Sequence, residues 1–135
     1  MVSQSMISRS DPSRTCAPSV VVLSTDEMLR DAVTYWFKSL AILTIATADG
    51  YEANRAIKEG DVRLLITDRV LPPWPGLDTF RQLRTANPSL RVAYVDDGSW
   101  DGAILARVAG SVVILPRPLE RRRVIEAFGG PEVLS

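Results

Sequence analysis

The sequence predicts an α/β domain in which helices cover both faces of a five-stranded parallel sheet. Two observations support this prediction. Five short runs of β-branched and apolar residues alternate along the chain with amphipathic segments of helical periodicity. These runs are largely apolar at consecutive positions, which is typical of strands buried on both faces of a parallel sheet. A chain of 135 residues, 46% of them hydrophobic, can bury a core for one such domain.

Three strands and two helices are expected in the first half of the chain. In order, they are strand 19–24 (SVVVLS), helix 25–40, strand 41–48 (AILTIATA), helix 51–60 and strand 62–68 (VRLLITD). The first helix has the clearest pattern, because its apolar residues recur at i, i+3, i+4, i+7 and i+8. Asp26 and Glu27 favour a helix N-terminus, and Gly60 is placed to end the second helix.

Two strands and three helices are expected in the second half. In order, they are helix 77–87, strand 91–97 (RVAYVDD), helix 99–110, strand 111–116 (SVVILP) and helix 119–128. Asn87-Pro88 and Gly110 are placed to stop the first two of these helices. We therefore expect one domain over 19–128, between a flexible polar tail (1–18) and a short C-terminal tail (129–135).

The strict alternation of strands and helices restricts the topology. Right-handed crossovers place helices over both faces of the sheet, which predicts a flavodoxin-like (βα)5 domain, doubly wound, with strand order 2-1-3-4-5. In such sheets, ligands bind beyond the carboxyl ends of the strands. The side chains expected there are Ser24, Thr25 and Asp26, then Asp68, then Asp96 and Asp97, and finally Pro116, Arg117 and Pro118.

Composition excludes several classes of function. The 16 basic and 16 acidic residues cancel, so no overall field attracts nucleic acid or an anionic membrane. Cys16 is the single cysteine, which precludes an intrachain disulfide and suits a reducing compartment. The opening segment lacks the apolar core of a signal peptide, and no apolar run approaches the ~20 residues that span a bilayer. We expect a cytoplasmic protein that binds neither nucleic acid nor membranes.

Two segments at the expected ligand edge resemble the receiver domain of two-component response regulators. LLITDRVLPPWPG resembles the third-strand segment of that family, with Asp68 at the phosphoacceptor position and Leu71-Pro72 and Gly76 following it. ILPRPLE resembles the end of the fifth strand, with Arg117 where the family has a phosphate-contacting Lys, followed by Pro118. The resemblance covers residues 19–128 and implies a phosphoryl transfer to Asp68 from a histidine kinase.

The chain departs from this family at the metal-binding positions. Receivers carry two acidic residues after the first strand, which help to hold Mg²⁺, and Ser24 and Thr25 stand there in this chain. Hydroxyls are poor replacements, because Mg²⁺ requires charged oxygen ligands to compete with its water shell. The resemblance leaves Asp68, Asp26 and Val70 as the positions of a weakened Mg²⁺ site.

The switch positions also differ. Asp96 stands where receivers have a Thr or Ser whose hydroxyl bonds the phosphoryl group, and an ionised carboxylate cannot donate a hydrogen bond. Ile114 replaces an aromatic residue that rotates in many receivers, and Arg117 replaces a mobile Lys with a planar group. We therefore expect a degenerate receiver with weak or absent phosphorylation. A normally phosphorylated single-domain response regulator is the alternative.

Each of these site residues also has a structural interpretation. Asp68 could be a strand-end carboxylate that is either satisfied by loop N–H groups or paired with Arg117. Asp96 could be a turn residue, and Asp26 a helix-terminus charge. An acidic site built from Asp26, Asp68 and Asp96 is a further alternative. Because three strand ends converge at one edge, we favour a functional role for this group.

The sequence also bears on two other functions and on partner surfaces. A flavodoxin-like nucleotide or flavin binder would use the same edge, but no Gly-rich loop is present. A hydrolase is disfavoured because the chain has no His and no nucleophile elbow. No output domain follows the last helix, so we expect action through protein contact. Candidate contacts are the face built from 99–110, 111–116 and 119–128, where a homodimer or heterodimer could form, the cluster Arg121 to Arg123, and the loop residues Trp74 and Trp100.

Overall fold

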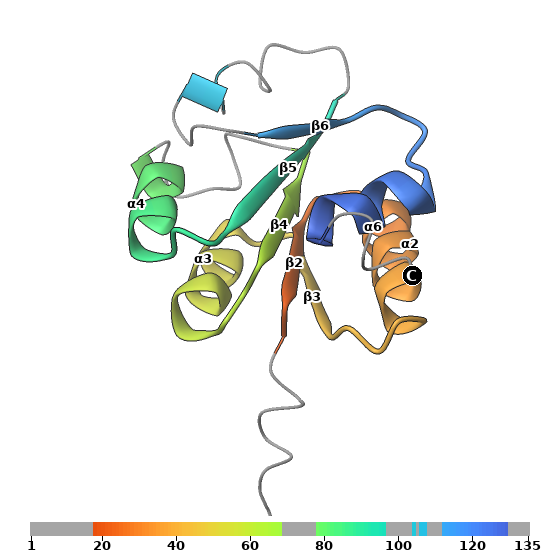
Figure 1. Ribbon diagram of the computed structural model, residues 1–135, viewed down its shortest axis with the longest axis horizontal. Helices are drawn as coiled ribbons and strands as arrows, with labels where there is room; N and C mark the ends of the chain where they lie inside the picture. The colour runs from red at the N-terminus through yellow and green to blue at the C-terminus, as the bar shows by residue number, and fades with distance from the viewer. Residues whose placement is uncertain (1–17, 69–77, 97–103, 105, 108–111, 130–135) are drawn as a thin grey trace, which may run out of the picture.

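The structure is a computed structural model that describes residues 18–68, 78–96, 104, 106–107 and 112–129 (Figure 1). Five parallel strands form one sheet in the order β3-β2-β4-β5-β6. They are β2 (Val20–Leu23), β3 (Thr44–Thr47), β4 (Leu64–Thr67), β5 (Arg91–Val95) and β6 (Val113–Leu115). Numbered among themselves in chain order, the strands follow 2-1-3-4-5, which confirms the predicted flavodoxin-like topology.

Four helices of the described part cover the sheet. They are α2 (Glu27–Lys38), α3 (Gly50–Glu59), α4 (Asp78–Ala86) and α6 (Arg121–Gly129). Figure 1 shows α2 and α6 together on one face of the sheet and α3 and α4 on the other. This two-sided covering is what right-handed crossovers between parallel strands produce.

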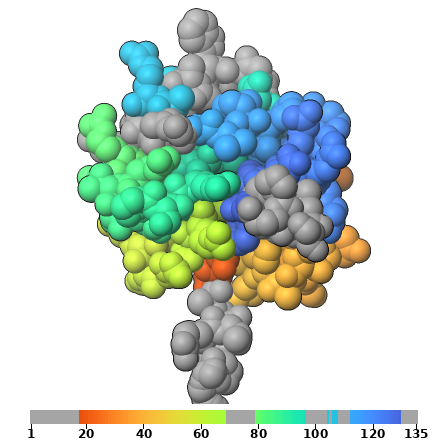
Figure 2. Space-filling view, viewed as in Figure 1, coloured from red at the N-terminus to blue at the C-terminus, as the bar shows by residue number. Residues whose placement is uncertain are grey.

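The sheet divides the core into two clusters, and β2 contributes to both. Val20 and Val22 pack with Phe37 and Phe128 on the side of α2 and α6. Val21 and Leu23 pack on the side of α3 and α4. All four residues of β2 are fully buried, which confirms that its continuous apolar run marks a central strand. Figure 2 shows the surface from the same side, with the residues of α3 and α4 next to each other and those of α6 across from them.

The first helix ends differently from the prediction. Strand character was expected from residue 41, but β3 begins at Thr44. Ala41 has a φ of 60°, and its N–H donates to the Lys38 carbonyl at 2.9 Å, while the Ile42 N–H donates to the Phe37 carbonyl at 3.0 Å. These two bonds are the pattern of a Schellman motif, which closes a helix through one left-handed residue. Alanine carries no sequence signal for this turn.

Several predictions fall outside the described residues. Cys16, Val70, Asp97, Trp74 and Trp100 belong to this group, as do Leu71-Pro72, Gly76, Gly110 and most of both predicted tails. Within the predicted helix 99–110, Ile104, Ala106 and Arg107 are described and are helical. Over the part of the chain that the structure covers, no helix is long and apolar enough to cross a bilayer.

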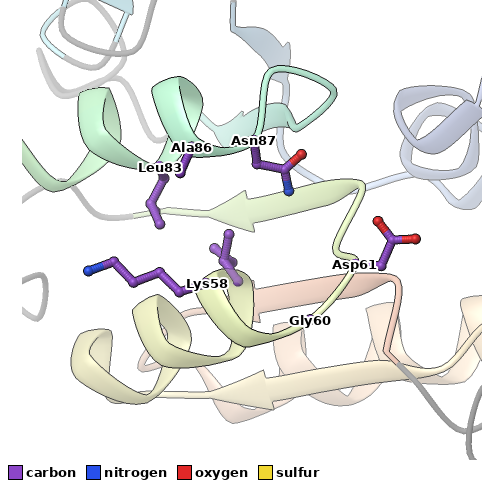
Figure 3. Close-up of a pocket in the computed structure, with 7 residues that line it drawn as sticks. Lys58, Gly60, Asp61, Leu83, Ala86 and Asn87 are labelled. Carbon is purple, nitrogen blue, oxygen red and sulfur yellow. The ribbon is translucent and has the colours of Figure 1, made fainter.

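At the amino-terminal edge of the sheet, the ends of α3 and α4 leave a hollow of about 270 Å³ (Figure 3). Lys58, Gly60, Asp61 and Asn87 line it together with apolar side chains. The Gly60 N–H donates to the Ala56 carbonyl at 3.0 Å, so this glycine closes α3 as expected. The hollow lies opposite the edge where the candidate site residues follow the strands.

Candidate functional site

The register of the sheet brings the predicted residues to one edge. Leu23 of β2 pairs with Thr67 of β4, so the next residues, Ser24 and Asp68, leave neighbouring strands at the same level. Val95 of β5 pairs with Leu115 of β6 in the same way. Parallel strands end on the same side of a sheet, and the structure therefore gathers Ser24, Asp68, Asp96 and Arg117 there.

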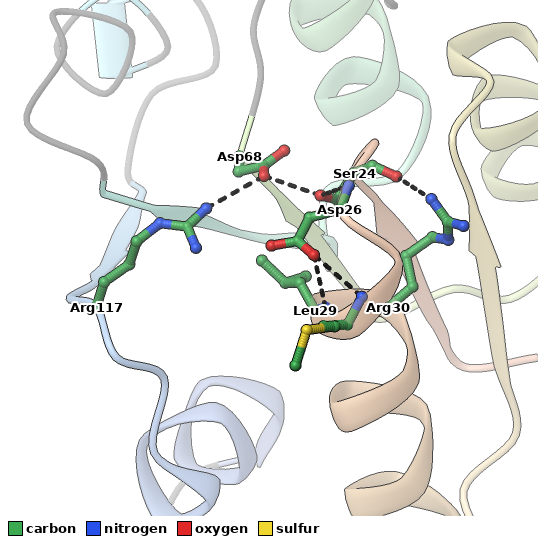
Figure 4. A network of polar contacts seen from close by, with 7 residues as sticks. Ser24, Asp26, Leu29, Arg30, Asp68 and Arg117 are labelled. Atoms are coloured by element: carbon green, nitrogen blue, oxygen red, sulfur yellow. Dashed lines mark hydrogen bonds and ion pairs between the residues drawn. The ribbon is translucent and has the colours of Figure 1, made fainter.

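Asp68 is the buried acidic residue of this site. Its side chain is 7% exposed, and its Oδ2 atom accepts two contacts from neighbouring strand ends (Figure 4). The Ser24 hydroxyl donates to Oδ2 at 2.8 Å, and the Arg117 Nη2 lies 3.3 Å from the same oxygen. The structure therefore shows Asp68 as a strand-end carboxylate that is paired with Arg117.

Both the side chain and the backbone carbonyl of Ser24 are held by hydrogen bonds. Its hydroxyl accepts the Asp26 N–H at 2.9 Å and donates to Asp68, so the single hydroxyl proton is directed at the carboxylate. The Ser24 carbonyl accepts from the Arg30 Nη1 at 2.8 Å. Sequence reasoning missed Arg30, because an arginine on the second turn of an amphipathic helix matches no site motif. Its guanidinium reaches back over α2 to the end of β2 (Figure 4).

The two oxygens of Asp68 have unequal surroundings. Oδ2 carries both described contacts, whereas Oδ1 is buried and has no hydrogen-bond partner in the described part of the molecule. A buried acceptor without a donor loses its hydration and costs about 1–3 kcal/mol.

Asp26 acts as the N-cap of α2. Its Oδ1 accepts the N–H groups of Met28 at 3.0 Å and of Leu29 at 3.4 Å. This confirms the interpretation of Asp26 as a helix-terminus residue. The side chain is exposed, and in Figure 4 it is turned toward the helix N-terminus.

Asp96 follows β5 and is half-buried, and its N–H donates to the Leu115 carbonyl at 2.9 Å. Among the residues for which coordinates are described, no group of three or more acidic, Cys or His side chains is placed to hold a metal ion. Of the three carboxylates in the alternative acidic site, Asp26 caps α2 and Asp68 pairs with Arg117.

A groove of about 350 Å³ adjoins Arg117, between α2 and the segment before α6. Its lining is mostly apolar: Met28, Leu29, Ala32, Trp36, Pro118 and Leu119, with Asp26 and Arg117 as the charged residues. Arg117 therefore contributes both to the ion pair with Asp68 and to a surface groove. Sequence periodicity alone did not predict this groove, because its two walls come from opposite ends of the domain.

Comparison with known proteins agrees with the fold. No protein-family model matches the sequence. The chain is 24% identical over 110 residues to the DNA-binding transcriptional regulator NtrC of Azospirillum brasilense. The match covers 81% of this chain but only 23% of the length of that regulator.

Solved structures of receiver domains resemble the chain over most of its length. The signal receiver domain of an HD domain-containing protein from Pseudomonas fluorescens Pf-5 is 16% identical with a TM-score of 0.68, covering 82% of this chain and 90% of that one. The receiver domain of nitrogen regulatory protein C is 21% identical with a TM-score of 0.66, covering 84% and 95%. The chemotaxis response regulator CheY4 of Vibrio cholerae is 15% identical with a TM-score of 0.66, and the match covers 81% of this chain and 93% of that one. The chain therefore has the fold of response regulator receiver domains.

Proposed function

We propose that this chain is a cytoplasmic receiver-like domain of two-component phosphorelay signalling that acts through protein–protein contact. Asp68 stands at the phosphoacceptor position, and its phosphorylation is weak or absent. The observation that carries the proposal is the buried carboxylate of Asp68, held by Ser24 and Arg117 at the ligand edge of a receiver fold. No catalytic activity beyond self-phosphorylation at Asp68 is proposed.

The chemistry at Asp68 would be phosphoryl transfer to a carboxylate oxygen. A new O–P bond would form while the P–N bond of a phosphohistidine breaks, and the nitrogen would keep the electron pair. The protein's part in such a transfer is to position the groups and to neutralise charge. Arg117 lies 3.3 Å from Oδ2 and offers one positive charge. However, the two acidic residues that receivers carry after the first strand are replaced here by Ser24 and Thr25.

The residues present fit Mg²⁺ poorly, which supports weak phosphorylation. Of the expected ligand positions, Asp68 supplies one buried carboxylate, and the Asp26 oxygen already accepts two helix N–H groups. Val70 lies outside the described residues. Mg²⁺ requires several oxygen ligands in near-octahedral geometry, and one carboxylate beside an arginine offers it little advantage over water.

Asp96 also opposes the modification. At the switch position, an ionised carboxylate offers no donor to a phosphoryl oxygen and repels its negative charge. The residue follows β5 at the edge that holds Asp68, as its backbone bond to Leu115 shows. We infer that the domain does not use the hydroxyl-coupled switch of typical receivers.

Two surfaces support action by contact. Ile104, Val113 and Ile114 are 38%, 42% and 47% exposed, and the last two belong to the edge strand β6. The apolar groove beside Arg117 offers a second surface. Candidate partners are a histidine kinase, another two-component protein or a second copy of the chain. Nucleic acid and membranes are not proposed as partners.

Intact mass spectrometry tests the state of Asp68. The wild type, Asp68→Asn and the control Asp31→Asn would be incubated with Mg²⁺ and acetyl phosphate, and then with candidate histidine kinases. We expect little or no phosphoryl mass gain in any of them. Stoichiometric gain in the wild type and in Asp31→Asn, absent from Asp68→Asn, would instead identify a normally phosphorylated response regulator.

A flavodoxin-like nucleotide or flavin binder remains the second candidate function. Its support is limited to Ser24 and Thr25 at the turn before α2, where a phosphate could meet a helix N-terminus. However, the Asp26 side chain already caps that terminus, and Asp68 lies beside it. A visible absorption spectrum of the purified protein, with and without added flavin, would separate the two functions.

A further inference from the structure

We propose that Arg117 is the built-in counter-ion of Asp68, in the role that a divalent cation would otherwise fill, and that Ser24 makes this arrangement possible. The inference rests on the proposed function, since it concerns regulation of that same site. It adds that the chain itself supplies the positive charge that faces Asp68, so that this carboxylate does not take up a divalent metal.

The ion pair is placed where it can neutralise a buried charge. The Arg117 Nη2 lies 3.3 Å from Oδ2 of Asp68, and the carboxylate side chain is 7% exposed while that of Arg117 is 41% exposed. The buried partner is screened little by water or salt, so it needs a nearby positive charge. A guanidinium stays protonated throughout the physiological range, and therefore this counter-ion is always charged.

Of the two described side chains that contact Oδ2 of Asp68, Ser24 is neutral and Arg117 is positively charged. The Ser24 Oγ is 2.8 Å from Oδ2, so a carboxylate at position 24 would place a second negative charge in contact with Asp68. Two such carboxylates cannot both stay ionised without a cation between them. With a neutral hydroxyl there, one arginine balances the site.

The hydroxyl also gives Asp68 a directed donor. The Asp26 N–H donates to Oγ at 2.9 Å, so the hydroxyl proton is left for Oδ2. The Arg30 bond to the Ser24 carbonyl fixes the backbone at the end of β2. Oδ2 thus receives a hydrogen bond and an ion pair, whereas Oδ1 has no hydrogen-bond partner among the residues that the structure describes.

Titration with Mn²⁺ and Mg²⁺, followed by isothermal calorimetry and thermal melting, tests this inference. The proteins compared are the wild type, Asp68→Asn, Ser24→Asp and the size-matched neutral control Ser24→Asn. We expect the wild type and Ser24→Asn to show no saturable binding that depends on Asp68. Ser24→Asp should bind Mn²⁺ at least about tenfold more tightly than Ser24→Asn, because carboxylate count sets affinity for hard cations.

A second pair of variants covers the case in which Ser24→Asp does not fold. Arg117→Ala removes the counter-ion and should gain Mn²⁺ affinity by several-fold, whereas Arg117→Lys keeps the charge and should gain none. The inference is overturned if the wild type binds Mg²⁺ and Asp68→Asn abolishes that binding. It is also overturned if neither Ser24→Asp nor Arg117→Ala gains affinity.

These outcomes are separate from a failure of the proposed function. If the wild type binds metal at Asp68 but acquires no phosphoryl group, the counter-ion inference fails and the degenerate receiver stands. If the wild type binds no metal and yet acquires phosphoryl groups at Asp68, the degenerate receiver fails and the counter-ion inference stands.

Discussion

Neighbouring side chains decide what Asp68 can do. Its position at the end of β4 is set by the sheet, but its chemistry depends on the hydroxyl of Ser24 and the guanidinium of Arg117, which share Oδ2. The sequence left open whether Asp68 pairs with Arg117, because pairing depends on how the two strand-end segments approach each other. It could not reveal the contact of Arg30 with Ser24, since residues six apart carry no pairing signal in a motif.

Ala41 offers a test of a single strained residue. It holds a φ of 60°, a conformation that costs a residue with a Cβ about 1–2 kcal/mol and costs glycine little. We expect Ala41→Gly to raise the free energy of unfolding by about 1 kcal/mol, measured by urea denaturation. Ser39→Gly, at a right-handed position, is the control and should lower it. A destabilised Ala41→Gly would contradict the Schellman geometry.

Strands were easier to predict than their ends. β2 (VVVL) is apolar at every position and β4 (LLIT) at all but Thr67, because both faces of these strands are buried. The end of α2 was misjudged because Ala41 closes the helix where a glycine would have been recognised. The predicted helix 51–60 lies at Gly50–Glu59, shifted by one residue, since Asp49 takes the N-cap position.

Substitutions of Asp26 distinguish a role as the N-cap of α2 from a role as a metal ligand. If Asp26 is an N-cap, Asp26→Ala should lower the free energy of unfolding by about 1 kcal/mol, because two helix N–H groups lose their acceptor. Asp26→Ser keeps a capping oxygen and should cost much less. Both variants should respond to Mg²⁺ as the wild type does. A Mg²⁺-dependent stabilisation of the wild type that both variants lack would instead assign Asp26 to a metal site.

The whole domain combines a receiver fold with an altered site. Continuous strands, helical periodicity and strand-end residues were sufficient to predict the topology and the edge that holds Asp68. The pairing within that edge was not predictable, because a shift of a few ångströms decides whether Arg117 contacts Asp68 or solvent. Partner surfaces were harder still, since exposure of Val113 and Ile114 depends on the packing of the entire β6 side.

Self-association through the β6 side is the expected consequence of those exposed side chains. Ile114→Lys places a charge at an exposed apolar position of the edge strand β6, and it should weaken association by at least about tenfold. Sedimentation velocity over a concentration series would measure this. Tyr35→Lys, an exposed site on α2, is the matched control. Equal behaviour of the wild type and both variants would remove this face as the homodimer contact.

The most direct test of the account is a two-dimensional amide NMR spectrum of the wild type, recorded before and after addition of Mg²⁺ and acetyl phosphate, with Asp68→Asn as reference. We expect no Asp68-dependent shifts at the ends of β2, β4, β5 or β6, because Arg117 already balances the carboxylate and no phosphoryl group is retained. Shifts that appear at Asp68, spread to β6 and are absent from Asp68→Asn would contradict it and identify a switching receiver.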